Sequence, residues 1–269
     1  MRLDRGRVIR ATRTPDGPAT LELRHIGDRL AVEAWGPGAD RAIDAAAALV
    51  GLDEDRSSFR PAHPLVADLD RRLAGLRIGR SRAVLEALIP AILEQKVTGT
   101  EARRGYRGLI AGWGEAAPGP FGLRLLPPAA TVAAIPYFAL HPFGVERRRA
   151  ELVRTVAARA GRFEETVELP LADAYRRLTA LPGIGPWTAA EVALRALGDA
   201  DAVSVGDYHL PSLVSFAFTG ERRGSDERML ELLEPFRPHR GRVIRLLETA
   251  GIRPAPRGPR MEPRSIAAI

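Results

Sequence analysis

A short turn rich in glycine and proline constrains the fold of this chain more than any other stretch. Residues 181–189 read Leu-Pro-Gly-Ile-Gly-Pro-Trp-Thr-Ala. Apolar residues at helical spacing precede the turn in 171–178 and follow it from Pro186 to Leu197, where Gly198 ends the pattern. Proline suits the first position of a helix, and glycine suits the position just after its end. The stretch therefore predicts two short helices joined by a tight turn.

The glycines of this turn predict what it could bind. Gly183 and Gly185 allow a positive φ angle and a close approach of another molecule to the backbone. The backbone N–H groups of the turn then lie at the positive end of the second helix, where a phosphate group is a natural ligand. An ordinary helix–helix turn with a glycine cap is the alternative that the glycines alone leave open.

An aspartate follows the turn at a spacing that suggests a function. Asp207, in the sequence Val-Gly-Asp-Tyr, stands about two dozen residues after Gly183. The turn and this aspartate resemble the helix-hairpin-helix/Gly-Pro-Asp superfamily of DNA glycosylases, in which an essential aspartate follows the hairpin at such a spacing. The Trp-Thr-Ala sequence of 187–189 and the Asp-Tyr pair resemble the branch of bacterial inducible 3-methyladenine DNA glycosylases. The resemblance extends more loosely over residues 82–251.

The resemblance implies a fold and an activity. The implied fold is mainly α-helical, with two helical subdomains that flank a cleft and a small antiparallel β-rich subdomain before them. The implied activity is that of a monofunctional DNA N-glycosylase, which flips damaged purines, above all alkylated ones, out of the duplex and excises them in base excision repair. Two alternatives are a glycosylase for deaminated, oxidised or mismatched bases and a non-catalytic module that grips DNA. The second alternative would lack Asp207 and the aromatic residues of a base pocket.

Asp207 is the candidate catalytic residue. Hydrolysis of an N-glycosidic bond passes through a sugar with oxocarbenium character. A fixed carboxylate in a partly desolvated site can stabilise the developing positive charge and help to align a water molecule. The other interpretation of Asp207 is a helix N-cap, because it directly precedes an apolar helical run. The hairpin upstream favours catalysis.

The resemblance also implies the residues that bind DNA and the base. Contacts to the DNA backbone fall on Gly183, Ile184, Gly185 and Thr188. The base pocket falls on Trp187 and Tyr208, which can stack on an electron-deficient purine, with Phe236 and Glu191 as further members. Each aromatic residue could instead pack in the core. Related enzymes can carry an aromatic residue in place of Glu191, so a more polar pocket is expected here.

The turn between two predicted helices supplies the residues implied to fill the gap that a flipped nucleotide leaves. Gln95 and Lys96 occupy this place. Relatives often use an apolar wedge there, so Lys96 is a departure, and a solvated helix corner is the alternative. Lyase-competent members carry a lysine two residues after the second hairpin glycine, where this chain has Trp187. We therefore expect no lyase activity, with Lys96, the only lysine of the chain, as the rival nucleophile.

Composition supports a polyanionic partner and excludes some cofactors. The net charge is +7 with 40 basic residues, which attracts nucleic acid, although an arginine-rich genome could also explain it. There is no cysteine, so disulfides and an iron-sulfur cluster are excluded, and five scattered histidines show no metal-ligand spacing. We expect no cofactor, with room for a structural monovalent cation at the hairpin. The expected partner is double-stranded DNA with damaged bases, bound by a monomer.

No membrane segment or secretion signal is expected. No stretch approaches the ~18 consecutive apolar residues of a membrane span, and Met1 leads into no signal-like region. A cytoplasmic, nucleoid-associated location follows by default.

Hydrophobic patterns divide the chain into a β-rich start and a helical remainder. Short β-like runs with turns between them occupy residues 7–35, and Asp40 and Gly51 bound a helix over 42–50. Helices are expected at 66–73, at 82–95 with Ser81 as its N-cap, and after a capping box at 98–101. Further helices are expected at 131–140, 146–160, 229–233 and 243–247. We expect an N-terminal subdomain over 1–58, a helical glycosylase region over 59–253 and a disordered tail rich in proline and arginine over 254–269.

Overall fold

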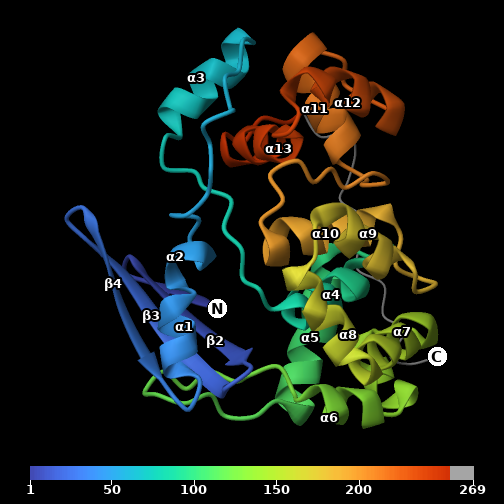
Figure 1. Cartoon of the computed structure of the whole chain (residues 1–269). Helices are drawn as coiled ribbons and strands as arrows, with labels where there is room; N and C mark the ends of the chain where they lie inside the picture. The colour runs from blue at the N-terminus through green and yellow to red at the C-terminus, as the bar shows by residue number, and fades with distance from the viewer. Residues whose placement is uncertain (255–269) are drawn as a thin grey trace. The chain divides into compact units, whose positions relative to one another are not determined.

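A computed structural model describes residues 1–254 of the chain (Figure 1). The protein is mainly helical, with one four-stranded antiparallel sheet near the N-terminus. This confirms the predicted fold class of a mainly α protein with a β-rich start. No helix within residues 1–254 is long and apolar enough to cross a membrane. The tail predicted as disordered lies, except for Pro254, outside the described residues.

The described chain forms two compact units, each assembled from separate stretches of sequence. One unit contains residues 1–49 and 82–166, and the other contains residues 50–81 and 167–254. The predicted boundary at residue 58 divides the chain in another way and stays a prediction.

The sheet of the first unit consists of four consecutive strands in the order β1-β2-β3-β4. Each strand pairs antiparallel with the next, because Pro15-Asp16 and Gly27-Asp28 form short turns that reverse the chain. The expected β-like runs correspond to the last three strands. Three residues are too few to show an alternating pattern, so β1 was not expected. The strands are β1 (Arg2–Asp4), β2 (Arg7–Thr14), β3 (Gly17–Ile26) and β4 (Arg29–Trp35).

Helices and short 3-10 segments complete the first unit and lead out of it. They are α1 (Ala39–Asp44), α2 (Ala46–Leu49), α4 (Val84–Glu94), α5 (Gly99–Trp113), α6 (Ala129–Ala134), η1 (Tyr137–Phe143), α7 (Arg147–Ala158), α8 (Ala160–Glu164) and η2 (Glu165–Glu168). Two predicted helices are divided. Ala45 separates α1 from α2 within 42–50, and the fixed φ angle of Pro136 ends the regular helix within 131–140.

Carboxylates fix the ends and the packing of helices in this unit. The predicted capping box begins α5: the Thr98 hydroxyl accepts the Glu101 N–H at 3.3 Å, and Glu101 accepts the Thr98 N–H at 2.8 Å. The prediction that Ser81 caps α4 is wrong. Glu164, 80 residues away from the helix start, accepts the first two N–H groups of α4 at 2.8 Å each. Glu86 in α4 accepts three hydrogen bonds from β2, which joins the sheet to the helices.

The second unit is helical. Its elements are α3 (Pro64–Arg72), α9 (Leu171–Thr179), α10 (Pro186–Val192), the π-helix η3 (Ala193–Leu197), α11 (Leu210–Thr219), α12 (Asp226–Leu233), η4 (Glu234–Phe236) and α13 (Arg240–Thr249). Figure 1 shows α3, α11, α12 and α13 of this unit. Their apolar side chains form its core, with Val66, Val214, Met229 and Val243 fully buried. Arg242 is also fully buried and pairs with Glu54.

Candidate active site

Helices α9 and α10 form the predicted hairpin, and Pro186 occupies the first position of α10 as expected. Gly183 has a φ angle of 99°, a conformation that L side chains rarely adopt. Gly185 has φ −93° and ψ −178°. Gly183 therefore adopts the positive φ angle that glycine allows, whereas Gly185 does not.

The surroundings of the turn differ from residue to residue. A Cβ atom placed on Gly185 would meet no atom of the protein within 4 Å. The Ile184 side chain is buried, and its N–H donates to the Leu181 carbonyl oxygen at 3.0 Å. The Thr188 side chain is 2% exposed. The protein thus leaves open space beside Gly185, whereas Ile184 and Thr188 turn their side chains into the unit.

Three N–H groups hold the carboxylate of Asp207. Its Oδ1 accepts the backbone N–H groups of His209 at 2.7 Å and Leu210 at 3.0 Å, at the start of α11. Its Oδ2 accepts the Nε1–H of Trp187 at 3.0 Å. The backbone bonds satisfy two N–H groups at the start of α11, although His209, and not Asp207 as the capping interpretation predicts, occupies the N-cap position. The bond to Trp187 is one that capping does not need, and it ties the carboxylate to α10 of the hairpin.

A second chain of contacts connects α10 to Asp207 through the backbone. The Asp207 N–H donates to the Ser204 carbonyl oxygen at 3.2 Å, and the Ser204 hydroxyl donates to Glu191 Oε1 at 2.5 Å. Glu191 Oε2 pairs with Arg195 at 2.5 Å. Both oxygens of Glu191, predicted to line the base pocket, therefore have partners within the protein.

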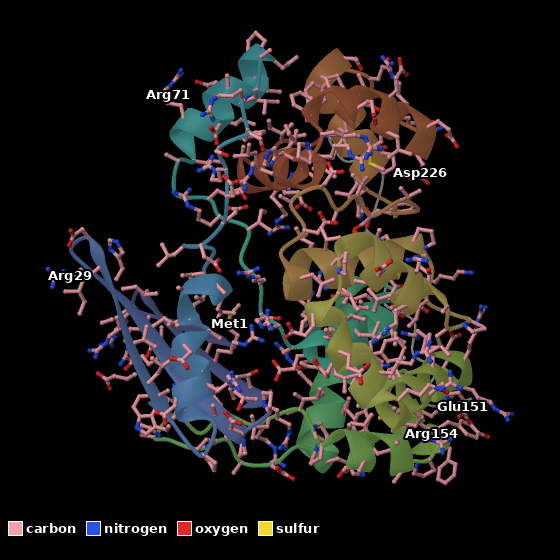
Figure 2. The ribbon with its side chains drawn as sticks, viewed as in Figure 1. Met1, Arg29, Arg71, Glu151, Arg154 and Asp226 are labelled. Carbon is pink, nitrogen blue, oxygen red and sulfur yellow. The ribbon has the colours of Figure 1, made fainter. Side chains whose placement is uncertain are left out.

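Two further carboxylates lie around Asp207 that sequence reasoning did not single out. Asp226, labelled in Figure 2, accepts the N–H of Gly206 at 3.1 and 3.0 Å. Burial raises the pKa of the Glu248 carboxyl, and the negative charges of Glu191 and Asp207 raise it further. No local pattern marks either residue, because each lies on a helix that follows α11 in the sequence.

The other predicted pocket residues lie in different surroundings. The Tyr208 side chain is 86% exposed, with its ring 4.9 Å from that of His209. Phe236 is 8% exposed and packs 5.5 Å from Phe218 in the core of the second unit. It also lines a cavity of about 400 Å³, whose lining does not include Trp187, Asp207 or Tyr208. The structure thus brings Trp187 and Asp207 together and places Phe236 as the core-packing alternative describes.

Gln95 and Lys96 lie in the turn between α4 and α5, in the first unit. Lys96 is exposed and has a φ angle of 56°, which is uncommon for a residue with a side chain. The buried Arg149 donates to the carbonyl oxygens of Leu93 at 2.8 Å and Gly144 at 3.3 Å. Arg149 therefore fixes the end of α4 from which this turn departs.

The site shows no metal centre within the described part of the chain. Across residues 1–254, no group of three histidine, cysteine, aspartate or glutamate side chains could hold a metal ion. For a monovalent cation, the hairpin turn offers backbone carbonyl oxygens, the kind of donor that hard cations prefer.

Comparison with curated proteins finds similar sequences among DNA repair enzymes. No protein-family model matches the sequence. The chain is 32% identical over 175 residues to the probable bifunctional transcriptional activator/DNA repair enzyme AlkA of Mycobacterium tuberculosis. The match covers 60% of this chain and 34% of the relative, so the chain spans about a third of the length of the curated relatives that it matches.

Solved structures share the fold along most of the chain. The 3-methyladenine DNA glycosylase from Archaeoglobus fulgidus matches with a TM-score of 0.77 and 23% identity, over 91% of this chain and 87% of that one. The 8-oxoguanine glycosylase/lyase of Clostridium acetobutylicum, in complex with double-stranded DNA, matches with a TM-score of 0.68 and 15% identity, over 88% and 86%.

The fold, with a β-rich start followed by helices that include the hairpin, matches that of the 3-methyladenine DNA glycosylase from Archaeoglobus fulgidus. The chain thus shares its fold with the Archaeoglobus fulgidus glycosylase and part of its sequence with the AlkA relative.

Proposed function

We propose that this chain is a monofunctional DNA N-glycosylase that excises damaged purines, above all alkylated ones, from double-stranded DNA. The observation that carries the proposal is the Trp187–Asp207 hydrogen bond, which fixes a carboxylate beside the hairpin. A module that only grips DNA has no need of a carboxylate held by both a helix start and the hairpin. The names of the AlkA relative and the Archaeoglobus fulgidus neighbour support this activity class.

The geometry of Asp207 suits hydrolysis through a cationic sugar. When the bond from C1′ to the base nitrogen breaks, the base leaves with the electron pair and positive charge develops on the sugar. A carboxylate that is already oriented stabilises this charge without reorganising. Its two oxygens offer about four acceptor positions, and the three bonds described above use three. The remaining position can accept a hydrogen bond from the attacking water and take its proton as the water oxygen bonds to C1′.

The hairpin is proposed to hold the DNA backbone through contacts at Gly183, Ile184, Gly185 and Thr188. The open space beside Gly185 supports this, because neither its φ angle nor its neighbours within the protein require glycine there. A phosphate that approaches the backbone closely would require it. Because the Ile184 and Thr188 side chains are buried, their contribution would come from the backbone.

Two aromatic residues are proposed to receive the flipped base. Tyr208, one residue after Asp207, is 86% exposed, and Trp187 is half-buried with its Nε1 bonded to the carboxylate. Stacking on aromatic rings favours electron-deficient, alkylated purines. Phe236 and Glu191 remain weaker proposals, because the first packs in the core and the second is held by Ser204 and Arg195. Gln95 and Lys96 are proposed to fill the gap in the stack.

A glycosylase for oxidised bases is the second candidate, since the Clostridium acetobutylicum neighbour is an 8-oxoguanine glycosylase/lyase with the same fold. A panel of duplexes tests both functions. Each duplex carries one 7-methylguanine, 3-methyladenine, hypoxanthine or 8-oxoguanine, and released base is measured under single-turnover conditions. We expect the alkylated purines to be released fastest. Preferential release of 8-oxoguanine would favour the second candidate, and binding of all duplexes without release would show a DNA-binding module.

A further inference from the structure

The loop that carries Asp207 has no regular secondary structure of its own. Residues 198–209, between η3 and α11, form neither helix nor strand. Gly198 ends η3 in a left-handed conformation with φ 74°. A loop of this length holds a side chain in place only when other contacts fix its backbone.

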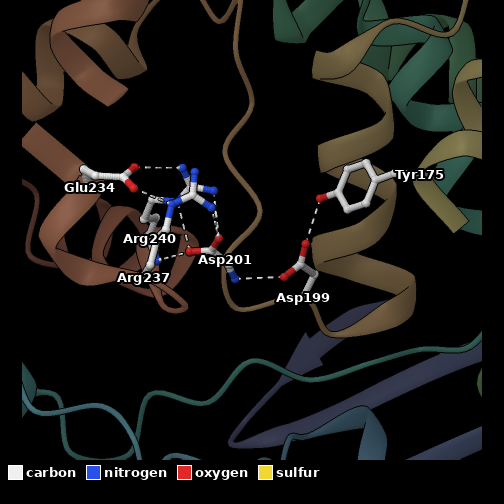
Figure 3. A network of polar contacts seen from close by, with 6 residues as sticks. All are labelled: Tyr175, Asp199, Asp201, Glu234, Arg237 and Arg240. Carbon is white, nitrogen blue, oxygen red and sulfur yellow. Dashed lines mark hydrogen bonds and ion pairs between the residues drawn. The ribbon is translucent and has the colours of Figure 1, made fainter. Parts of the chain in front are cut away.

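An ion pair provides such a contact six residues before Asp207. Arg240, at the start of α13, donates from Nε to Asp201 Oδ1 at 3.0 Å and from Nη2 to Oδ2 at 2.7 Å (Figure 3). The Arg240 backbone N–H also donates to Oδ1 at 3.0 Å. The Arg240 side chain is 12% exposed and that of Asp201 is 19% exposed. A bidentate pair with this little exposure to water is geometrically specific and stronger than an exposed one.

The backbones at this point are also in direct contact. The N–H of Arg242 donates to the Ala200 carbonyl oxygen at 2.9 Å. A Cβ atom on Gly241 would lie 2.6 Å from the carbonyl oxygen of Ala202 and 2.9 Å from that of Ala200, which is too close for any side chain. The first turn of α13 therefore lies directly against the loop.

The same loop is attached to the hairpin. The Tyr175 hydroxyl, on α9, donates to Asp199 Oδ2 at 2.8 Å, and Asp199 Oδ1 accepts the N–H of Asp201 at 2.9 Å (Figure 3). Arg237 and Glu234 stand at the outer edge of the network: Arg237 is 53% exposed and lies 3.4 Å from Asp201. The tightest contacts thus converge on Asp199 and Asp201.

We propose that Asp201 and Arg240 are a positioning pair for the Asp207 carboxylate. The pair anchors the loop to α13, while Tyr175 anchors it to α9, so the carboxylate is held at a fixed place relative to the hairpin. The inference rests on the proposed function, because it assigns a role in that reaction. Displacing a reacting group by about 1 Å can reduce a rate roughly 100-fold, so the loss of one anchor should appear in the chemical step.

The test uses Asp201→Asn and Arg240→Gln in the full chain. We expect the single-turnover excision rate constant to fall roughly 10- to 100-fold in each variant. The dissociation constant for a duplex with an abasic site should change less than about threefold, because the hairpin supplies that contact. The double variant should lose no more than the more damaged single variant, since both remove one interaction.

Two controls separate positioning from general stability. Val243→Ala opens a cavity in the core at α13 and should lower the melting temperature at least as much as Asp201→Asn does. Its excision rate should nevertheless stay within about twofold of the wild-type rate. Arg237→Gln removes a charge from the outer edge of the same network and should also leave the rate nearly unchanged. An unchanged rate in folded Asp201→Asn, or an equal fall in Val243→Ala, overturns the inference.

Amide hydrogen exchange gives a reading that does not depend on activity. The N–H groups of His209 and Leu210 are bonded to Asp207, so their protection reports the position of its carboxylate. We expect these amide hydrogens to exchange faster in Asp201→Asn than in wild type, while the exchange rates in the core of α13 stay the same. Wild-type protein that releases no base refutes the proposed function, and the exchange result then decides the positioning role by itself.

Discussion

Asp207→Asn removes one charge and little else from the candidate active site. The asparagine carbonyl oxygen can still accept the N–H groups of His209 and Leu210, so α11 should remain capped. The amide nitrogen then faces Trp187 Nε1, where two donors meet in place of a hydrogen bond. The substitution therefore tests the negative charge and its link to Trp187 with little effect on the fold.

The expected size of the effect follows from the partial burial of Asp207. A unit charge about 4 Å from the developing sugar cation, at an effective dielectric constant of about 20, contributes roughly 4 kcal/mol. Each ~1.4 kcal/mol changes a rate about tenfold. We expect the single-turnover excision rate constant to fall about 1,000-fold, with little change in the dissociation constant for the duplex, because the charge acts on the transition state.

Excision from a duplex with one 7-methylguanine, measured with enzyme in excess, provides the assay. Asp173→Asn is a matched control, because Asp173 is an aspartate of the hairpin helix α9 that pairs with Arg176 on the surface. This control should retain the wild-type rate. A rate within about fivefold of wild type in Asp207→Asn would remove Asp207 from the catalytic role.

Three other predictions concern the hairpin, the chemistry after excision and the pH dependence of stability. Gly185→Asp should weaken binding to every duplex by a similar factor. Gly185→Ala should fold normally, because no atom of the protein lies within 4 Å of the added Cβ. If Gly185→Asp binds DNA as tightly as wild type across a salt titration, the hairpin does not contact DNA. The enzyme should leave an intact abasic site that breaks only in alkali, since Trp187 replaces the lysine of related lyases; a borohydride-trapped complex that disappears in Lys96→Ala would establish a lyase instead. Because the pKa of Glu248 is raised on folding, the folded protein binds its proton more tightly, and stability is lost as the pH rises through that pKa. The melting temperature of Glu248→Gln should therefore rise relative to that of wild type as the pH increases above 4.5, the ordinary pKa of a glutamate carboxyl, and a constant difference would exclude this linkage.

The parts of the fold that depend on neighbouring residues could be predicted from the sequence. The hairpin, Pro186 at the start of α10 and the capping box of α5 all arise from residues within one or two helical turns. Contacts between distant segments could not be predicted. Glu164 caps α4 across 80 residues, and Arg242 reaches Glu54 across 188, because packing selects these partners after local structure has formed.

Some residues of the candidate site could also be predicted from the sequence, but the contacts between them could not. Sequence reasoning named both Trp187 and Asp207, but not the hydrogen bond between them, which requires α10 and the start of α11 to meet. It placed Glu191 in the base pocket without showing that Ser204 and Arg195 occupy both of its oxygens. Asp201 was missed because nothing in the sequence around it marks it; its partner Arg240 is 39 residues away.

The turn between α4 and α5 contains a site for covalent labelling. Lys96 is the only lysine of the chain and is exposed there, so an amine-reactive fluorophore has one side-chain target, with the terminal α-amine as the other. A dye on Lys96 would report directly on the turn proposed to enter the DNA stack. Its fluorescence anisotropy and quenching during addition of an abasic duplex would follow insertion in real time, in a protein whose amino-acid sequence is unchanged.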